Sequence, residues 1–317
     1  MVYDTGYQEF WEMKKETAWG TAVVPDADVG LLEATGSYAE TQGVEENFGV
    51  GSRLNNQNTY GKYGVSGSLT GSIANGRLLA YTLGADSAAG TEPTTHTITN
   101  LATAALSSFT LTKNMVNTDK GYKIAGCKIN DVALSLETGG KLSATYNWIG
   151  KDVTTIASTV GTRPGVTETI LPAYTGTVSW ASGEIEVSNW NFNYNNNLGD
   201  DEYSISDRRR KAITEGQVTM NGSFTAIFTS HDIYDDFKTA FSTGVETGTA
   251  RAMSLVATTG ATTSSYELSL ALTDVNLTEL SSPVNLDNKR VVAEFSYIPK
   301  ALGTVTYKDQ FATTYIA

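Results

Sequence analysis

The sequence predicts a mainly β protein made of two tandem β-sandwich or barrel units, each with one short flanking α-helix. The first observation is composition: Gly and Tyr are plentiful, with 30 and 16 copies, and long runs of Leu, Lys, Glu and Ala are absent. This balance favours strands and turns over helical bundles. The other two observations are segments that alternate apolar and polar residues, and the recurrence of such segments in the same order. A chain of 317 residues is long enough for two domains.

The clearest repeat pairs the segment Val65–Ile73 (VSGSLTGSI) with Met220–Phe228 (MNGSFTAIF). The two align without gaps, and Gly67 and Gly222 fall at the same place. Every second residue is apolar and the residues between them are polar, as expected for a strand that is buried on one face. The core residues expected from this pair are Val65, Leu69, Met220, Phe224 and Phe228.

A second block pairs Ile129–Leu136 (INDVALSL) with Leu272–Glu279 (LTDVNLTE). The alternation changes phase in both copies at an aspartate, Asp131 or Asp274. An extra residue in a strand shifts the phase in this way, so the alignment predicts a shared β-bulge.

A third block pairs Leu142–Lys151 (LSATYNWIGK) with Val291–Lys300 (VVAEFSYIPK). Three blocks in one order indicate an internal duplication, because differences in loop length cost little. The core residues expected from this block are Tyr146, Trp148, Phe295 and Tyr297.

The repeats divide the chain into an N-terminal arm over residues 1–30, a first unit over 31–153, a linker rich in Thr, Gly and Pro over 154–176, a second unit over 177–300 and a C-terminal tail over 301–317. In each unit we expect a strand, a long polar excursion, a second strand, a short helix and two or three further strands. The helix of the second unit is the clearer, because its apolar residues recur at helical spacing; they are Ile233, Tyr234, Phe237 and Phe241.

The polar excursions are Glu40–Tyr60 in the first unit and Asn195–Glu215 in the second. Long loops in a compact domain are uncommon unless they are functional or disordered. Since these two offer little to pack against their own unit, we interpret them as arms that become ordered against a neighbouring subunit. The residues expected at such a stacking contact are Glu40, Glu45, Glu46, Arg53, Asp200, Asp201, Glu202, Arg208, Arg209, Arg210 and Lys211.

The basic run Arg208–Lys211 allows three interpretations. A nucleic-acid patch conflicts with the formal net charge of −12, because binders of the phosphate backbone are basic. A solvated loop tip is the second interpretation. The third, which we favour, is pairing with carboxylates of the next subunit, such as Glu45 and Glu46, since guanidinium groups suit bidentate carboxylate contacts.

Sites for chemistry are scarce in the sequence. The single cysteine, Cys127, fits a small buried hydrophobe, and neither His96 nor His231 has a second ligand at metal-binding spacing. We therefore expect no cofactor, no metal and no enzymatic activity, although a glycosidase pair of carboxylates distant in sequence stays open. No stretch is long and apolar enough for a membrane helix, and the N-terminus has no apolar signal region, so we expect a cytoplasmic origin and no membrane contact.

Three segments together resemble the tail tube proteins of long-tailed bacterial or archaeal viruses. Residues 16–22 (ETAWGTA) resemble the opening of many of these proteins. Gly126–Lys151 resembles their central hairpin, in which a Gly-Gly turn joins two alternating strands that end in Gly-Lys. Ile185–Phe241 resembles their second half, and the likeness covers most of residues 10–300.

The resemblance implies a β-sandwich with a flanking helix that assembles with itself into rings, which stack into a hollow tube in the virion tail. Inner strands of neighbouring subunits would join into one barrel, and the genome would pass through a negative lumen without specific binding. The implied partners are other copies of the chain and the tail terminator, baseplate or tip, and tape-measure proteins, with assembly in the host cytoplasm.

The resemblance implies six similar positions per ring, so a duplicated unit predicts three chains per ring, with true threefold and pseudo-sixfold symmetry. A hexamer in which one unit decorates the outside is the alternative. Two other functions stay open on the sequence alone. One is a secreted or surface-layer β-sandwich protein, and the other is a carbohydrate-binding module.

Overall fold

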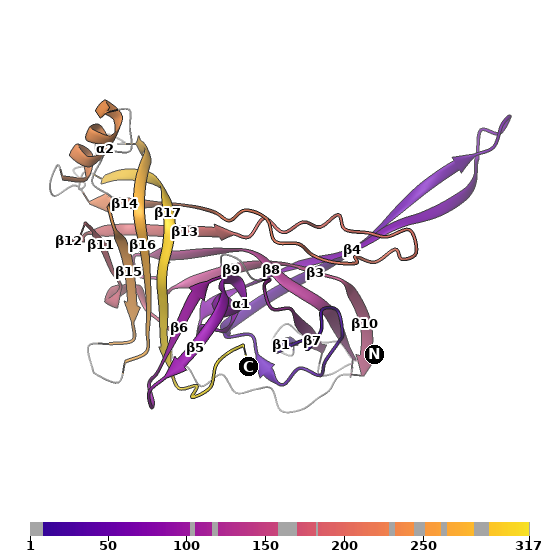
Figure 1. Ribbon diagram of the computed structural model, residues 1–317, viewed down its shortest axis with the longest axis horizontal. Coiled ribbons are helices and arrows are strands. Elements are labelled where there is room, and N and C mark those ends of the chain that lie inside the picture. Colours follow the sequence, from indigo (N-terminus) through magenta and orange to yellow (C-terminus); the bar gives the residue numbers. More distant parts are fainter. Residues whose placement is uncertain are drawn as a thin grey trace.

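The computed structural model describes residues 9–101, 105–115, 120–157, 170–181, 183–227, 232–243, 251–260, 265–281 and 292–316. The fold is mainly β, as predicted (Figure 1). The elements are β1 (Glu9–Lys15), β2 (Ala27–Asp28), β3 (Leu31–Phe48), β4 (Asn55–Ile73), α1 (Arg77–Leu83), β5 (Gly84–Ala89), β6 (Thr94–Asn100), β7 (Phe109–Met115), β8 (Lys120–Glu137), β9 (Ser143–Gly150), β10 (Asp152–Ala157), the short 3-10 helix η2 (Ala173–Thr175), β11 (Thr177–Trp180), β12 (Gly183–Ile185), β13 (Val187–Asn195), β14 (Thr219–Ile227), α2 (Asp232–Thr243), β15 (Met253–Thr258), β16 (Glu267–Ser281) and β17 (Val292–Asp309).

One long antiparallel sheet runs through the molecule. Its strands follow the order β3, β4, β9, β8, β13, β14, β17 and β16, each paired with the next. The alternating segments of the sequence form its middle strands, so one face carries the apolar side chains and the other carries the polar ones. We call this the inner sheet.

The two halves of the inner sheet have the same strand order and the same register. In the first half Leu69 lies opposite Tyr146, and in the second half Phe224 lies opposite Phe295. These are the residues that the sequence alignment paired. The order β3, β4, β9, β8 thus corresponds to β13, β14, β17, β16.

The paired glycines have a common physical cause. Gly67 lies opposite Trp148 and Gly222 lies opposite Tyr297. A Cβ atom on either glycine would lie 2.4 Å from the ring of that aromatic neighbour. Each ring therefore covers the bare backbone of the next strand, and a larger residue than glycine would displace it.

The predicted bulge is present, but its position in the second half differs from the alignment. In β8 the register shifts between Ile129 and Asp131, whereas in β16 it shifts between Leu277 and Glu279. Glu279, and not Asp274, therefore occupies the position of Asp131. The alignment was wrong here because the motif around both aspartates is short and alternation alone does not fix a register.

Two smaller sheets cover the apolar face of the inner sheet. One contains β2, β1, β7, the first part of β8, and β10, and the other contains β12, β11, β15, the first part of β16, the last part of β17, β6 and β5. The long strands β8, β16 and β17 pass from the inner sheet into these covering layers, so the core is continuous.

The predicted core residues lie in this core. The buried side chains are Val65, Leu69, Tyr146, Trp148, Phe224, Phe295 and Tyr297. Met220 is half-buried at the end of β14 and packs against the same cluster. Phe228 lies outside the described residues.

The chain ends are more integrated than the predicted arm and tail. Residues 9–15 form β1, which pairs along its whole length with β7. At the other end β17 continues past Lys300 to Asp309 and pairs with β6, a strand from the first half of the sequence. These contacts join segments far apart in the chain, so no local pattern in the sequence indicated them.

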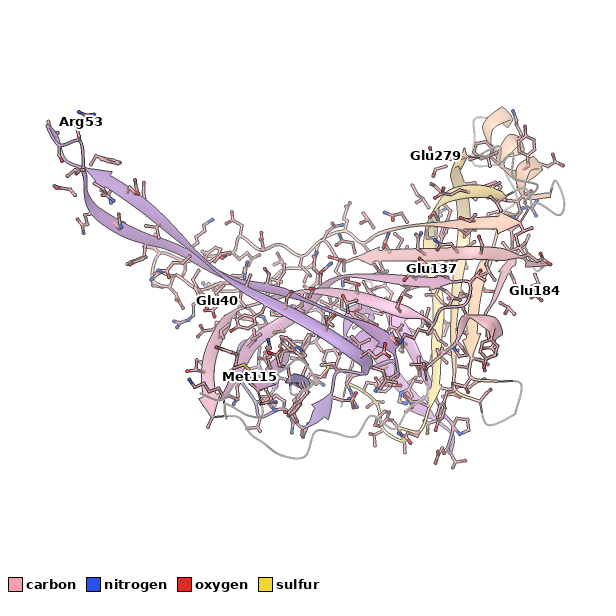
Figure 2. All side chains as sticks on the ribbon, turned by 180° about the vertical axis from the view of Figure 1, so that it is seen from behind. Glu40, Arg53, Met115, Glu137, Glu184 and Glu279 are labelled. Atoms are coloured by element: carbon pink, nitrogen blue, oxygen red, sulfur yellow. The ribbon has the colours of Figure 1, made fainter. Side chains whose placement is uncertain are left out.

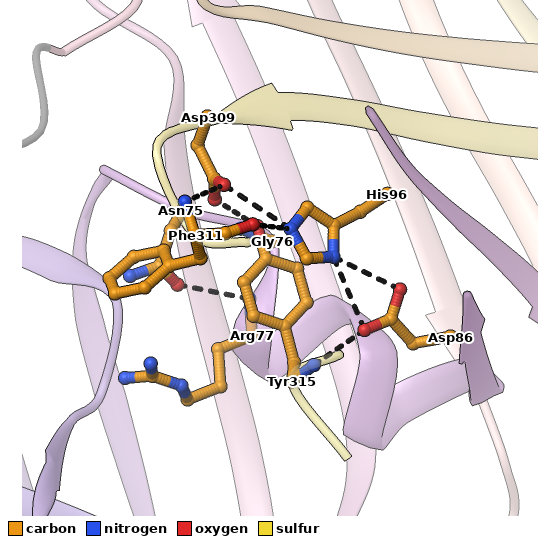
Figure 3. Close-up of polar contacts among 8 residues, drawn as sticks. All are labelled: Asn75, Gly76, Arg77, Asp86, His96, Asp309, Phe311 and Tyr315. Atoms are coloured by element: carbon orange, nitrogen blue, oxygen red, sulfur yellow. Dashed lines mark hydrogen bonds and ion pairs between the residues drawn. The ribbon is translucent and has the colours of Figure 1, made fainter. Parts of the chain in front are cut away.

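A buried polar cluster fixes the C-terminal segment (Figure 3). His96 is buried, with 0% of its surface exposed. Its Nδ1 lies 3.2 Å from an Asp86 carboxylate oxygen, its Nε2 lies 3.3 Å from Asp309, and its ring stacks on Tyr315 with centroids 3.9 Å apart. The Tyr315 hydroxyl in turn accepts a hydrogen bond from the Gly76 N–H at the start of α1.

The two helices lie where the sequence predicted a helix after the second strand of each unit. All of α1 is buried, and the Asn75 side chain accepts a hydrogen bond from the Arg77 N–H at 3.0 Å. Helix α2 is held to its covering sheet by the Trp180 indole N–H, which donates to Asp236 at 2.9 Å.

Candidate assembly surfaces

The first predicted excursion is a β-ribbon. Strands β3 and β4 continue past the inner sheet, pair with each other up to Phe48 and Asn55, and project away from the body (Figure 1). Figure 2 places Glu40 at the root of this ribbon and Arg53 at its far tip. The expectation of an irregular loop was wrong. The sequence did not indicate these strands, because both faces of the ribbon are exposed and its residues therefore do not alternate between apolar and polar.

The ribbon tip exposes apolar side chains. Phe48, Val50 and Leu54 are 59%, 109% and 77% exposed. Glu45 and Glu46 are exposed between the tip and the root. Apolar side chains gathered at the end of a long projection are typical of a contact with another molecule.

The second predicted excursion packs along the root of the ribbon. The Tyr63 N–H donates to the Arg208 carbonyl at 2.8 Å, and the Tyr203 hydroxyl donates to the Tyr63 carbonyl at 3.1 Å. Lys62 forms an ion pair with Asp201. The expectation that this segment has little to pack against in its own half holds in part. The contacts named above lie on the first half, and within its own half the Asn197 side-chain amide donates to the Gln217 carbonyl at 2.6 Å.

The base of this segment has its own small core. Leu198 and Ile213 are buried together with Leu106. The Lys128 ammonium lies 2.6 Å from a Glu215 carboxylate oxygen. Burial opposes ionisation of Glu215, but the contact with Lys128 prevails and lowers the pKa of that carboxyl.

Arg210 is an internal clamp and not a free contact residue. Its side chain is 6% exposed, and its Nη1 donates to the carbonyls of Val65 and Gly150 at 3.0 and 2.8 Å. Its Nε donates to the Asp200 carbonyl at 3.0 Å. The guanidinium thus joins the second excursion to β4 and β9.

The other basic residues of the run keep more of their surface. Arg209 is exposed and lies 2.8 Å from an Asp152 carboxylate oxygen. Arg208 is exposed and donates from Nε to the Gly61 carbonyl at 2.9 Å. Lys211 is exposed as well.

The acidic candidates divide in the same way. Glu40 accepts a hydrogen bond from the Tyr63 hydroxyl, and Asp201 is paired with Lys62. Asp200 is exposed, with its carboxylate 3.8 Å from Arg210, and Glu202 is half-buried.

The outermost strands of the inner sheet each keep an open edge. Strand β3 pairs with β4 on one side, and among the described residues no strand pairs along its other side over Leu31–Phe48. The last part of β16, residues 276–281, pairs with β17 only, within the same described part of the chain, whereas the Val275 N–H just before it donates to the Arg251 carbonyl at 2.8 Å. Unpaired N–H and C=O groups on such edges are ready to pair with another strand.

The polar face of the inner sheet is lined by small hydroxyl and amide side chains that bond across the strands. Ser37 and Ser68 lie 3.0 Å apart, as do Thr70 and Thr145, and Asn193 donates to Asn221 at 3.0 Å. The charged residues among the paired rows of this face are the acidic Asp131, Glu137, Glu279 and Glu294 and one cation, Lys128, which pairs with Ile149 and is buried against Glu215.

The ETAWGTA segment is a hydrogen-bonding hub. The buried carboxylate of Glu16 accepts from the N–H groups of Gly20 and Gly126 at 2.8 and 2.7 Å and from the hydroxyls of Ser108 and Thr110 at 2.8 and 2.9 Å. The hub ties residues 16–20 to β7 and β8.

The described part of the chain offers no group of metal-ligating side chains and no helix that is long and apolar enough to span a bilayer. A search of curated proteins found no match to the sequence. The model of the phage tail tube protein family matches residues 13–299, so the chain belongs to that family.

Proposed function

We propose that this protein is the repeating subunit of a hollow tail tube, in which copies form stacked rings and the genome passes through the channel. The observation that carries the proposal is the inner sheet with an open edge at each end, β3 and the last part of β16. Pairing each edge with the next copy satisfies both edges, and a head-to-tail contact that closes by rotation makes a ring.

The polar face of the inner sheet is the surface we assign to the channel. Its side chains are mostly small and uncharged or acidic, and the cation among its paired rows, Lys128, is buried and lies 2.6 Å from a Glu215 carboxylate oxygen. DNA would therefore slide past without specific binding.

The ribbon tip and the exposed part of the basic run are the surfaces we assign to the contact between stacked rings. They carry Phe48, Val50, Leu54, Arg53, Arg208, Arg209 and Lys211. Arg210 is left out of this set, because its clamp position buries it within one chain.

The two halves of the inner sheet support an internal duplication, with tandem units over residues 31–153 and 177–300 and a second unit that β17 completes through Asp309. The subunit would act as a structural component of the virion tail, without catalysis. It would assemble in the host cytoplasm and contact tail terminator, baseplate or tip, and tape-measure proteins at the tube ends and in the channel.

Electron microscopy of the purified protein tests the proposal. We expect rings or stacked tubes with a central channel, and monomers at all concentrations would refute it. A gold label on Asn193→Cys, on the polar face, should lie in the channel, whereas a label on Asp235→Cys in α2 should lie outside the wall.

A further inference from the structure

We propose that the joint between β8 and β13 inside one chain is a copy of the joint between chains, and that it specifies the register in which β16 of one copy pairs with β3 of the next. The inference rests on the proposed function, since it needs a ring. It adds the residue pairs that meet at the interface.

Strand positions support the correspondence. Strand β8 is the last strand of the first half of the inner sheet, as β16 is of the second. Strand β13 is the first of the second half, as β3 is of the first. The β8–β13 joint therefore links the end of one half to the start of the next, and a β16–β3 joint repeats that step.

Register shifts also correspond on both sides of the joint. In β3 the register shifts just before Thr35, and in β13 it shifts just before Asn189. Thr35 lies opposite Thr70, and Asn189 lies opposite Thr225. Bulges are fixed features of a strand, so two strands that share one at the same place share a position in the fold.

The last strands correspond in the same way. Asp131 lies opposite Asn147 just after the shift in β8, and Glu279 lies opposite Ser296 just after the shift in β16. Asn147 and Ser296 are themselves matched by the repeat of the third block. The position of the bulge and the repeat of the third block thus both match Asp131 with Glu279.

The pairs inside the chain then give the pairs between chains. Counted from the matched residues Thr35 and Asn189, Thr41 of β3 corresponds to Asn195 of β13. Asp131 lies opposite Asn195, and Glu279 corresponds to Asp131, so Glu279 is expected opposite Thr41 of the next copy. Ala133 lies opposite Asn193, so Ser281 is expected opposite Ala39.

The side chains at these positions fit close strands. Thr41, Ala39 and Ser281 are small, and they lie on the polar face of the inner sheet. In Figure 2 Glu40 and Glu279 lie on opposite sides of the molecule, as required of two edges that meet only between copies.

Disulfide cross-linking of assembled protein tests the register. Opposite residues of antiparallel strands have Cα atoms about 4.5–5.5 Å apart, which suits a disulfide. The test variant is Ala39→Cys with Ser281→Cys, oxidised after assembly with copper phenanthroline and air. The native Cys127 is buried and stays in every variant.

We expect a ladder of covalently joined chains in the test variant, because β3 and β16 lie at opposite edges of the sheet and a bond between them joins two copies. The variant Asn193→Cys with Ala133→Cys should form the matching bond within one chain and serves as the geometric control. The variant Ala39→Cys with Glu279→Cys is out of register and should give little ladder.

The outcomes separate the two proposals. Tubes that cross-link through the out-of-register pair, or through neither pair while the internal control does cross-link, would overturn the register and leave the tube intact. Failure of the unmodified protein to form any ring would overturn both.

Discussion

Glu16 shows why the ETAWGTA segment of this chain has its residue types. Its carboxylate accepts four hydrogen bonds from buried or half-buried donors. Gly20 adopts φ +70, and a Cβ there would meet the Lys151 side chain. The ammonium of Lys151 lies over the Trp19 ring, 4.8 Å from its centroid. The opening segment therefore packs against the Gly-Lys end of the central hairpin, through Trp19 and Gly20 on one side and Lys151 on the other.

Replacing Glu16 with Gln should lower the free energy of unfolding by about 3 kcal/mol, because one carboxamide oxygen cannot serve four donors and its NH₂ group faces them. Urea denaturation measures the change. The control is Glu184→Gln, at an exposed position in β12, which should change stability by less than about 0.5 kcal/mol. Equal effects of both variants would show that the hub does not stabilise the fold.

The His96 cluster predicts a loss of stability at alkaline pH. Burial lowers the pKa of His96, but the hydrogen bonds with Asp309 and Asp86 prevail and raise it to about 9 from 6.5. The folded protein therefore holds a proton that the unfolded chain releases. This contribution to stability is complete below about pH 6.5 and is lost as the pH rises through about 9.

Unfolding free energies between pH 6.5 and 9.5 test this prediction. The free energy should fall with pH in the unmodified protein, and the slope should be smaller in Asp309→Asn, in which one partner carboxylate is removed. A slope that is unchanged in this variant would assign the pH dependence to other groups.

At the scale of the strand, Phe224 is a buried residue of β14 that packs among aromatic rings in the core of the second half. The centroid of its ring lies 5.2 Å from the ring centroid of Phe295 and 6.3 Å from that of Trp180. Phe224→Ala should cost about 3–5 kcal/mol, the range for a fully buried aromatic. Ile205→Ala, at a fully exposed position of the second excursion, should be nearly neutral in the same denaturation measurement.

The Arg210 clamp predicts how the second excursion is held. Arg210→Met keeps an unbranched apolar stem but removes three hydrogen bonds to carbonyls, so the segment should detach from β4 while the core stays folded. Limited chymotrypsin digestion at Tyr203 should become faster. Arg208→Met loses one such bond at an exposed position and should change the rate less. Similar digestion of both variants would argue against the clamp.

Much of the fold could be predicted from local patterns in the sequence. The strands around Leu69, Phe224 and Phe295 were predictable, because apolar and polar residues alternate along each segment and the repeat showed the same pattern a second time. The paired glycines were visible as well, although their cause, a ring from the next strand, needed the structure.

Non-local contacts were not predictable in this way. Arg210 looked like its neighbours in a basic run, and nothing in the sequence marked it for burial against Val65 and Gly150. The ribbon of β3 and β4 has no buried face and therefore no apolar pattern. His96 is buried by β17 and the C-terminal segment, whose path across the first half is set by the whole fold.

At the scale of the molecule, the proposed tube would take two successive positions of its wall from each polypeptide. The β8–β13 pairing runs over Asp131–Glu137 and Asn189–Asn195, and it makes the two halves one continuous sheet. A ring built from such chains alternates covalently linked joints with joints between copies.

This continuity predicts the number of chains in a ring. In the hexamer alternative only one half would line the channel and the other would decorate the outside, which requires the wall to break at the β8–β13 joint. That joint contains seven residue pairs without a register shift, which favours a wall to which both halves contribute. If the ring has six positions, as in the family that this chain resembles, three chains fill them, with true threefold and pseudo-sixfold symmetry. Native mass measurement of a single ring should give three copies of the 33.9 kDa chain. Six copies would mean that one half of each chain leaves the wall, contrary to the pairing that the inner sheet displays.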